Sequence, residues 1–189
     1  MPAKGWATPA EANHERIVGE AARLLRERGP EAVGVAELMK RAGLTHGGFY
    51  GDLDSKEALV AEACERAFAE SADRVARRLG DGGAEALRAY IEGYLSQRHC
   101  ADRAQGCAAA ALAGDVAREG APVRAAFTRG LARLADALAE KLTGRARRRR
   151  ALTLLATLAG ALSLARAVDD PAVSDEILTA AREELLARL

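Results

Sequence analysis

Aromatic residues and prolines are scarce in this chain of 189 residues. Three Phe, three Tyr and one Trp make up 4% of the sequence, and there are five prolines. A β-sandwich contains many β-branched and aromatic residues at alternating positions, so this composition argues against one. Alanine, leucine, arginine and glutamate dominate instead, and they favour helices. Because 49% of the residues are hydrophobic and 29% charged, the chain can build a core, and we expect an all-α fold.

No charge of one sign prevails, and no apolar run is long. Lys and Arg number 28 and Asp and Glu 27, a formal net charge of +1 that excludes a polycationic, histone-like protein. The longest uncharged apolar run, residues 151–165, is about five residues short of a membrane-spanning helix, so a buried helix is expected there. The N-terminal residues hold no apolar stretch of signal-peptide length.

Cysteine is also rare, and familiar catalytic and metal-binding motifs are missing. The three cysteines are an odd number without CxxC spacing, which argues against a disulfide scaffold and a zinc ribbon. The three histidines are far apart in the sequence, which has no HExxH, P-loop, GxGxxG or GxSxG pattern. We therefore expect no enzyme, no metal site and no cofactor, and a location in the reducing cytoplasm.

Apolar residues recur at helical spacing along most of the chain. In the first segment Ile17, Ala21, Leu24 and Leu25 follow this spacing, and Gly29 with the proline after it ends the segment. A loop is expected around 99–106, where the periodicity fails. The pattern predicts about nine helices, near residues 11–28, 35–42, 46–50, 55–79, 87–95, 107–118, 131–142, 147–168 and 174–189.

Residues 35–50 have the pattern of a helix, a tight turn and a second helix. Gly43 can adopt the left-handed conformation that ends a helix and turns the chain sharply. A helix-turn-helix places its second helix in the major groove of DNA. Gly47 and Gly48 in that second helix cost about 1 kcal/mol each relative to Ala, and close approach of the backbone to a bulky partner is one reason to accept this.

The stretch VGVAELMKRAGLTHGGFYGDLDSKEALVAEA resembles the N-terminal signature of the TetR/AcrR family of transcriptional regulators. The resemblance spans about residues 11–65, and a later stretch, GCAAAALAGDVARE, is similar to a segment of many members. It implies a DNA-binding domain in residues 1–54 and a helical regulatory domain in residues 55–189. It also implies a homodimer on a palindromic operator, with repression relieved by a small-molecule inducer and no membrane association.

The resemblance also implies which residues contact DNA. They are Gly34, Thr45, His46, Gly47, Gly48, Tyr50 and Lys56. Three positions depart from the family pattern. Gly34 stands where a Thr or Ser is usual, Asp52 where His or Tyr is usual, and Leu53 where Phe is usual. Leu53 keeps an apolar anchor, whereas a carboxylate at Asp52 repels phosphate if it faces DNA.

In the second domain, two sets of residues are candidates for ligand binding and for dimer formation. Because the domain is rich in Ala and Leu, a small hydrophobic ligand is expected, neutral or weakly charged, with the few aromatics as lining. The candidate lining residues are Phe68, Tyr90, Tyr94 and Phe127. The last two helices are apolar over most of their faces, which predicts burial against a second copy. The candidate interface residues are Leu152, Leu155, Leu158, Leu162, Ile177, Ala181 and Leu185.

Other interpretations remain open at this point. Cys100 and Cys107 are candidate redox residues, and Cys100, with Arg98 and Arg103 nearby, is the better nucleophile for a thiol- or electrophile-sensing regulator. A third possibility is a helical binding protein whose DNA reading has decayed through Gly34 and Asp52. The arginine-rich run 145–150 is interpreted as a solvated helix start rather than a nucleic-acid patch.

Overall fold

The computed structural model describes residues 8–44 and 55–189, and helices account for most of them. No strand occurs in these two ranges, and the all-α prediction is confirmed. The helices are α1 (Pro9–Arg28), α2 (Val35–Ala42), α3 (Lys56–Leu79), α4 (Ala84–Tyr94), α5 (Gln97–Ala101), α6 (Ala108–Val116), α7 (Ala121–Lys141), α8 (Arg147–Ala167) and α9 (Pro171–Leu186), with a 3-10 turn at Pro30–Ala32.

Side-chain caps explain two differences from the predicted helix bounds. Helix α1 starts earlier than expected because Thr8 forms a capping box with Glu11 and Pro9 occupies the first helical position. Helix α5 lies where a loop was predicted, since the Ser96 hydroxyl accepts a hydrogen bond from the backbone N–H of His99 at 3.2 Å. The predicted helix at 46–50 lies outside the described residues.

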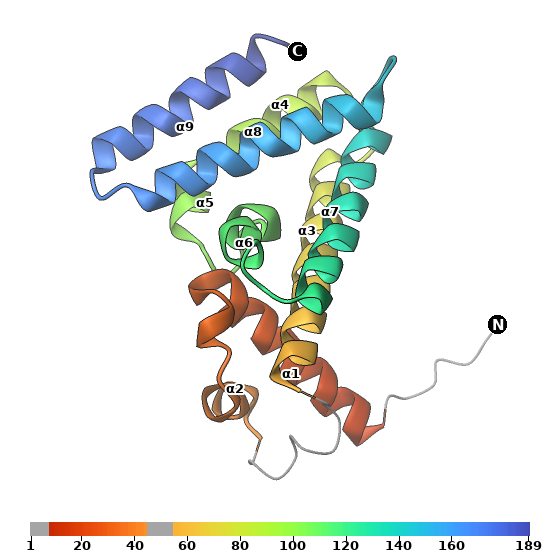
Figure 1. Cartoon of the computed structure of the whole chain (residues 1–189). Helices are drawn as coiled ribbons and strands as arrows, with labels where there is room; N and C mark the ends of the chain where they lie inside the picture. The colour runs from red at the N-terminus through yellow and green to blue at the C-terminus, as the bar shows by residue number, and fades with distance from the viewer. Residues whose placement is uncertain (1–7, 45–54) are drawn as a thin grey trace, which may run out of the picture.

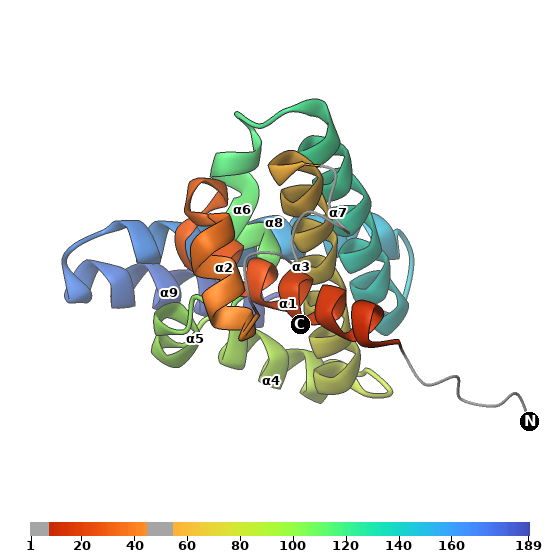
Figure 2. The same ribbon diagram turned by 90° about the horizontal axis from the view of Figure 1, so that it is seen from below.

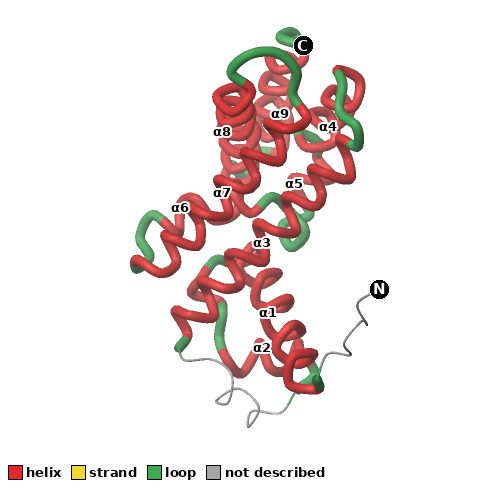
Figure 3. Tube along the Cα trace, turned by 90° about the vertical axis from the view of Figure 1, so that its right-hand side faces the viewer, coloured by secondary structure: helices red, strands yellow, loops and turns green. Residues whose placement is uncertain are grey.

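The helices form two groups at opposite ends of the molecule (Figure 1). Helices α1 and α2 lie at one end, and α8 and α9 run side by side at the other. Helix α3 extends from the first group into the second, and α6 lies between them. Seen from below, α1 crosses the end of α3 with α2 beside it (Figure 2). The side view separates the two groups most clearly (Figure 3).

The largest helix–helix contact in the second group is the packing of α3 along α7. The two helices approach closely at Gly130, where a Cβ atom would lie 2.4 Å from Cγ of Phe68. Phe68 is 1% exposed and packs edge-to-face on Phe127, with ring centroids 5.0 Å apart. A residue without a side chain is thus needed on α7 for Phe68 to enter the core.

Helix α8 contains the long apolar run. It has the length and apolar composition of a membrane-crossing helix, but α6, α7 and α9 all pack against it. Its side chains at Leu155, Leu158 and Leu162 are buried inside the chain. The run is therefore buried on one face only, because Leu152 and Leu164 on the other face are 41% and 61% exposed. Arg145 and the arginines of the first turn of α8, residues 147–150, are exposed, which agrees with a solvated helix start.

Candidate DNA-binding domain and ligand cavity

The turn after α2 has the geometry that the sequence predicts. Gly43 is left-handed, with φ of 65° and ψ of 34°, and the N–H of Leu44 donates to the carbonyl of Met39 at 2.9 Å. These features end a helix and turn the chain. Arg16 on α1 donates to the carbonyl of Ala42, so α1 supports the turn. The first half of the helix-turn-helix is therefore held against α1 in a defined orientation.

The structure describes two of the seven predicted DNA contacts. Gly34 is exposed at the start of α2 and provides no side-chain cap. Lys56 is exposed as the first residue of α3, directly after Ser55, whose hydroxyl caps the helix by accepting from the N–H of Ala58 at 3.0 Å. The other five predicted contacts lie outside the described residues. They are Thr45, His46, Gly47, Gly48 and Tyr50. Asp52 and Leu53 also lie outside the described residues.

Two arginines of α1 and α2 already pair with carboxylates. Arg41 pairs with Glu27 and Glu37, and Arg23 pairs with Glu20. Because phosphate affinity depends on cations that are free to replace counterions, such paired arginines contribute less than a free lysine. Lys56 is exposed and forms no ion pair with the described residues, so it is the stronger candidate for a phosphate contact.

A cavity of about 460 Å³ opens between α3, α4, α5, α7 and the segment that follows α5. This is the size of a small-molecule site. Its buried part is formed by Ser71, Tyr90, Tyr94, Cys107 and Leu134. Arg74 is half-buried, and the outer residues are exposed. The charged or polar residues at this opening are Arg78, Arg98, Asp102 and Gln105.

This cavity corrects two expectations from the sequence. Phe68 and Phe127 are not among its lining residues because they pack against each other in the core, and we do not retain them as ligand-binding candidates. The lining is also more polar than expected, since three arginines contribute to it. Tyr90 and Tyr94 do line the cavity, with ring centroids 5.9 Å apart.

Tyr94 lines the cavity, and its hydroxyl is buried. Burial raises its pKa well above the ordinary value, so the hydroxyl keeps its proton, and neighbouring Cys107 adds to the effect. That hydroxyl has no hydrogen-bond partner among the described residues. The ring packs edge-to-face on His99 at 4.7 Å, and the Nδ1–H of His99 donates to the carbonyl of Tyr94 at 2.7 Å. Burial lowers the pKa of His99, and the nearby cations Arg166, Arg78 and Arg74 lower it further.

The cysteines differ in their relation to the cavity. Cys107 lines it, whereas Cys100 does not, and both are buried. The carbonyl of Cys100 accepts a hydrogen bond from Nε of Arg166 at 3.0 Å, which fixes the backbone there. His99 and Arg103, its sequence neighbours, are engaged elsewhere, His99 with Tyr94 and Arg103 with the carbonyl of Arg166. Burial raises the pKa of the third thiol, Cys64, to about 12.

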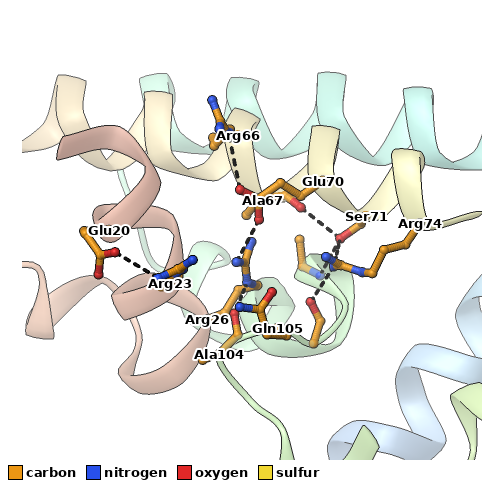
Figure 4. Close-up of polar contacts among 12 residues, drawn as sticks. Glu20, Arg23, Arg26, Arg66, Ala67, Glu70, Ser71, Arg74, Ala104 and Gln105 are labelled. Carbon is orange, nitrogen blue, oxygen red and sulfur yellow. Dashed lines mark hydrogen bonds and ion pairs between the residues drawn. The ribbon is translucent and has the colours of Figure 1, made fainter. Parts of the chain in front are cut away.

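A buried arginine on α1 contacts α3 and the segment that follows α5 (Figure 4). The side chain of Arg26 on α1 is 0% exposed, and its Nε donates to the carbonyl of Ala104 at 2.7 Å. Its Nη2 lies 2.9 Å from Oε2 of Glu70 on α3. This is an ionic contact without hydrogen-bond alignment, since neither Nη has a hydrogen-bond partner in the described part of the chain. Burial lowers the pKa of Arg26, and Glu70 opposes that shift.

Ala104 belongs to the segment 102–107, which also forms part of the cavity wall. Asp102, Gln105 and Cys107 of this segment line the cavity, and Nη2 of Arg74 donates to the carbonyl of Gly106 at 2.9 Å. Arg26 was not a candidate from the sequence. The signal was present, because Val18, Ala22 and Arg26 are spaced by four and a charge therefore falls on the buried face of α1.

The predicted dimer interface needs revision. Leu155, Leu158, Leu162 and Leu185 are buried within the single chain and cannot contact a second copy. Ile177 and Ala181 are half-buried. Leu152 is 41% exposed and Leu164 61%, and the smaller residues Ala156 and Gly160 are exposed between them at intervals of four. These four residues form one uncharged stripe on α8, which we call the α8 stripe.

Comparison with known proteins assigns the chain to a family. The model of bacterial regulatory proteins of the tetR family matches residues 17–63. An uncharacterized HTH-type transcriptional regulator of Mycobacterium tuberculosis is 31% identical over 186 residues, which cover 93% of this chain and 95% of the relative. The chain belongs to the TetR family. It is a DNA-binding transcriptional regulator, and this family is not one of enzymes.

Solved structures agree in fold along most of the chain. The reduced form of NemR from E. coli has a TM-score of 0.75 at 24% identity and covers 92% of this chain and 94% of its own. A TetR-family regulator from Cytophaga hutchinsonii has a TM-score of 0.77 at 16% identity and covers 97% and 98%. At these identities the likeness shows the fold alone.

Proposed function

We propose that this TetR-family regulator is a homodimeric repressor that binds a palindromic operator and is released by a small molecule. The observation that carries the proposal is the contact of Arg26 with Ala104, because it joins α1 of the DNA-binding end to the segment that lines the cavity. A molecule that moves this segment changes the position of α1. The two ends are therefore linked by a specific hydrogen bond as well as by packing.

The same reasoning makes α3 the second connection between the two ends. Lys56 lies at its first turn, and Ser71, Arg74 and Arg78 on the same helix line the cavity. In a dimer, two reading helices must be about 34–36 Å apart to enter successive major grooves. A ligand that binds better to a dimer with another separation shifts the population away from the DNA-binding state by its difference in affinity.

The α8 stripe supports the dimer part of the proposal. Its residues Leu152, Ala156, Gly160 and Leu164 leave a face without charge on a helix far from the DNA-binding end. Small residues in its centre allow a second helix to approach closely, and the flanking leucines supply apolar area. A two-fold pair of such helices, together with α9 of each copy, buries this face on both partners.

A thiol sensor is the second candidate function. Cys100 loses support as the sensing nucleophile, because it is buried and does not line the cavity. Cys107 lines the cavity, so an electrophile that enters it meets this thiol. Release by an oxidant that fails in a Cys107→Ser variant but persists in Cys100→Ser would favour this function over ligand binding.

Loss of Lys56 should weaken binding to all DNA sequences alike. Lys56→Ala removes an exposed cation at the start of α3, and phosphate contacts position a protein without specifying sequence. We expect the slope of log affinity against log salt to become shallower by about one unit. Gel shifts on the chain's own upstream region at several salt concentrations measure this slope.

The matched control for this experiment is Arg145→Ala. Arg145 is exposed just before α8, at the end of the molecule opposite the DNA-binding domain. Its substitution therefore removes one positive charge, as Lys56→Ala does, at a site that does not contact DNA. Its slope should equal that of the parent. Equal slopes for all three proteins would remove Lys56 from the interface. Failure of the parent to shift the upstream region or any selected DNA would contradict the proposed function itself.

A further inference from the structure

The opening of the cavity carries an excess of positive charge. Arg74, Arg78 and Arg98 line it, and Asp102 is the single carboxylate among its lining residues. The guanidinium of Arg78 lies against α4, where Nη1 would be 3.3 Å from a Cβ added at Gly93. Within the described ranges, neither Arg78 nor Arg98 forms an ion pair with a carboxylate. Two cations therefore face the entrance without protein partners.

The inner part of the cavity combines apolar surface with one free hydrogen-bond donor. Tyr90, Tyr94 and Leu134 provide aromatic and aliphatic surface. The buried hydroxyl of Tyr94 has no hydrogen-bond partner within residues 8–44 and 55–189, although a buried polar group without a hydrogen bond is costly and therefore uncommon in folded proteins. A ligand atom that accepts a hydrogen bond would satisfy it.

We propose that the cavity binds a small organic anion, with its apolar body against Tyr90, Tyr94 and Leu134 and its anionic group at Arg78 and Arg98. Guanidinium groups bind carboxylates and phosphates through paired, charge-assisted hydrogen bonds, so either group suits the site. A shift of the Tyr94 ring, whose hydroxyl is buried from solvent, would let that hydroxyl donate to an acceptor atom on the body. This inference rests on the proposed function, since it assigns the chemical class of the regulator's ligand.

The volume of the cavity limits the size of the ligand. About 460 Å³ is at the lower end of the range for small-molecule sites, so the ligand is no larger than a compact molecule of about three rings. The arrangement, with the anionic group near solvent and the apolar body inside, also explains how a charged molecule is bound without full removal of its charge from water. A purely hydrophobic ligand leaves both arginines and the Tyr94 hydroxyl unused.

The test compares two fluorescent probes that share a ring system. Anilinonaphthalene sulfonate carries an anionic group, and phenylnaphthylamine is its neutral counterpart. Titration into the full-length protein should show that the sulfonate binds about tenfold more tightly, as expected for charge-assisted contacts. Arg78→Gln with Arg98→Gln should lower the affinity for the sulfonate about tenfold and leave phenylnaphthylamine unchanged.

Two further variants make the test specific to this cavity. Arg77→Gln with Arg88→Gln removes the same two charges from exposed positions that do not line the cavity, and it should leave both affinities unchanged. Tyr94→Phe should weaken binding of 4-acetylbenzoate, whose ketone oxygen is an acceptor on the body, about fivefold, and should leave benzoate, which has no such acceptor, unchanged. It should cost no stability, because the buried hydroxyl that it removes has no hydrogen-bond partner among the described residues. Displacement of the sulfonate by benzoate or by phenyl phosphate then identifies whether carboxylate or phosphate fits better.

Several results would overturn the inference. They are equal affinity for the two probes, no effect of the double arginine variant, or no binding of the sulfonate at all. Release of the protein from DNA by neutral molecules but not by anions would refute the anionic ligand and leave the proposed regulator intact. Specific binding of the anion by a protein that binds no DNA would refute the proposed regulator and leave the anion site intact.

Discussion

A Glu70→Gln variant is expected to lose about 2–3 kcal/mol of its free energy of unfolding. Glu70 neutralises Arg26, whose side chain is 0% exposed, so the variant leaves a buried guanidinium without a counter-charge. Breaking a fully buried pair costs about 3–5 kcal/mol, and the expected loss is smaller here because the Glu70 side chain is 30% exposed. Urea denaturation followed by circular dichroism measures the change.

Arg26→Met is the matched variant, and it should be the milder of the two. It removes the buried charge together with the need to neutralise it, and Glu70 remains paired with Arg66 at 3.1 Å. The carbonyl of Ala104 loses its donor, so we expect a loss of about 1 kcal/mol. If Arg26→Met loses as much free energy of unfolding as Glu70→Gln, or more, then Arg26 stabilises the fold through its packing or its hydrogen bond. The cost of Glu70→Gln would then not come from an unneutralised buried charge.

Leu164→Arg is expected to convert the proposed dimer to a folded monomer and to abolish specific operator binding. Leu164 is 61% exposed at one end of the α8 stripe, so an arginine there fits the single chain but places a charge in the apolar interface. Light scattering should show half the parent's mass, and circular dichroism should show unchanged helicity. A monomer has lost the second reading helix and most of its operator affinity.

Two comparisons make the dimer prediction specific. Ala76→Arg introduces the same charge at an exposed position of α3 and should remain a dimer. Leu162→Arg is different, because Leu162 is 0% exposed within the chain, and it should unfold the protein rather than dissociate it. A Leu164→Arg protein that stays dimeric would show that the copies associate through another face.

Features fixed by local conformation could be predicted from the sequence. Gly43 was assigned to the turn after α2 because one glycine between two apolar patterns is sufficient to indicate a left-handed helix end, and its φ is 65°. Tyr90 and Tyr94 are four residues apart, which places them on one helix face, and both line the cavity.

Features that depend on packing between distant segments could not be predicted. Phe68 and Phe127 looked like pocket residues, but Phe68 enters a space left by Gly130, which only the approach of α3 to α7 reveals. Helix α8 is apolar nearly all round, so its sequence does not distinguish Leu162, which faces the chain, from Leu164, which faces outward. The three arginines of the cavity come from two helices, Arg74 and Arg78 from α3 and Arg98 from α5, and only the packing of these helices brings them together.

The most direct test of the proposed regulator is selection of bound sequences from a pool of random duplex DNA by the full-length protein. The account predicts enrichment of an inverted repeat whose half-site centres lie about 34–36 Å apart, one turn of DNA. It also predicts that this enrichment disappears with Leu164→Arg. Recovery of no common sequence, or of a single half-site without a symmetric partner, would contradict a dimeric, operator-binding regulator.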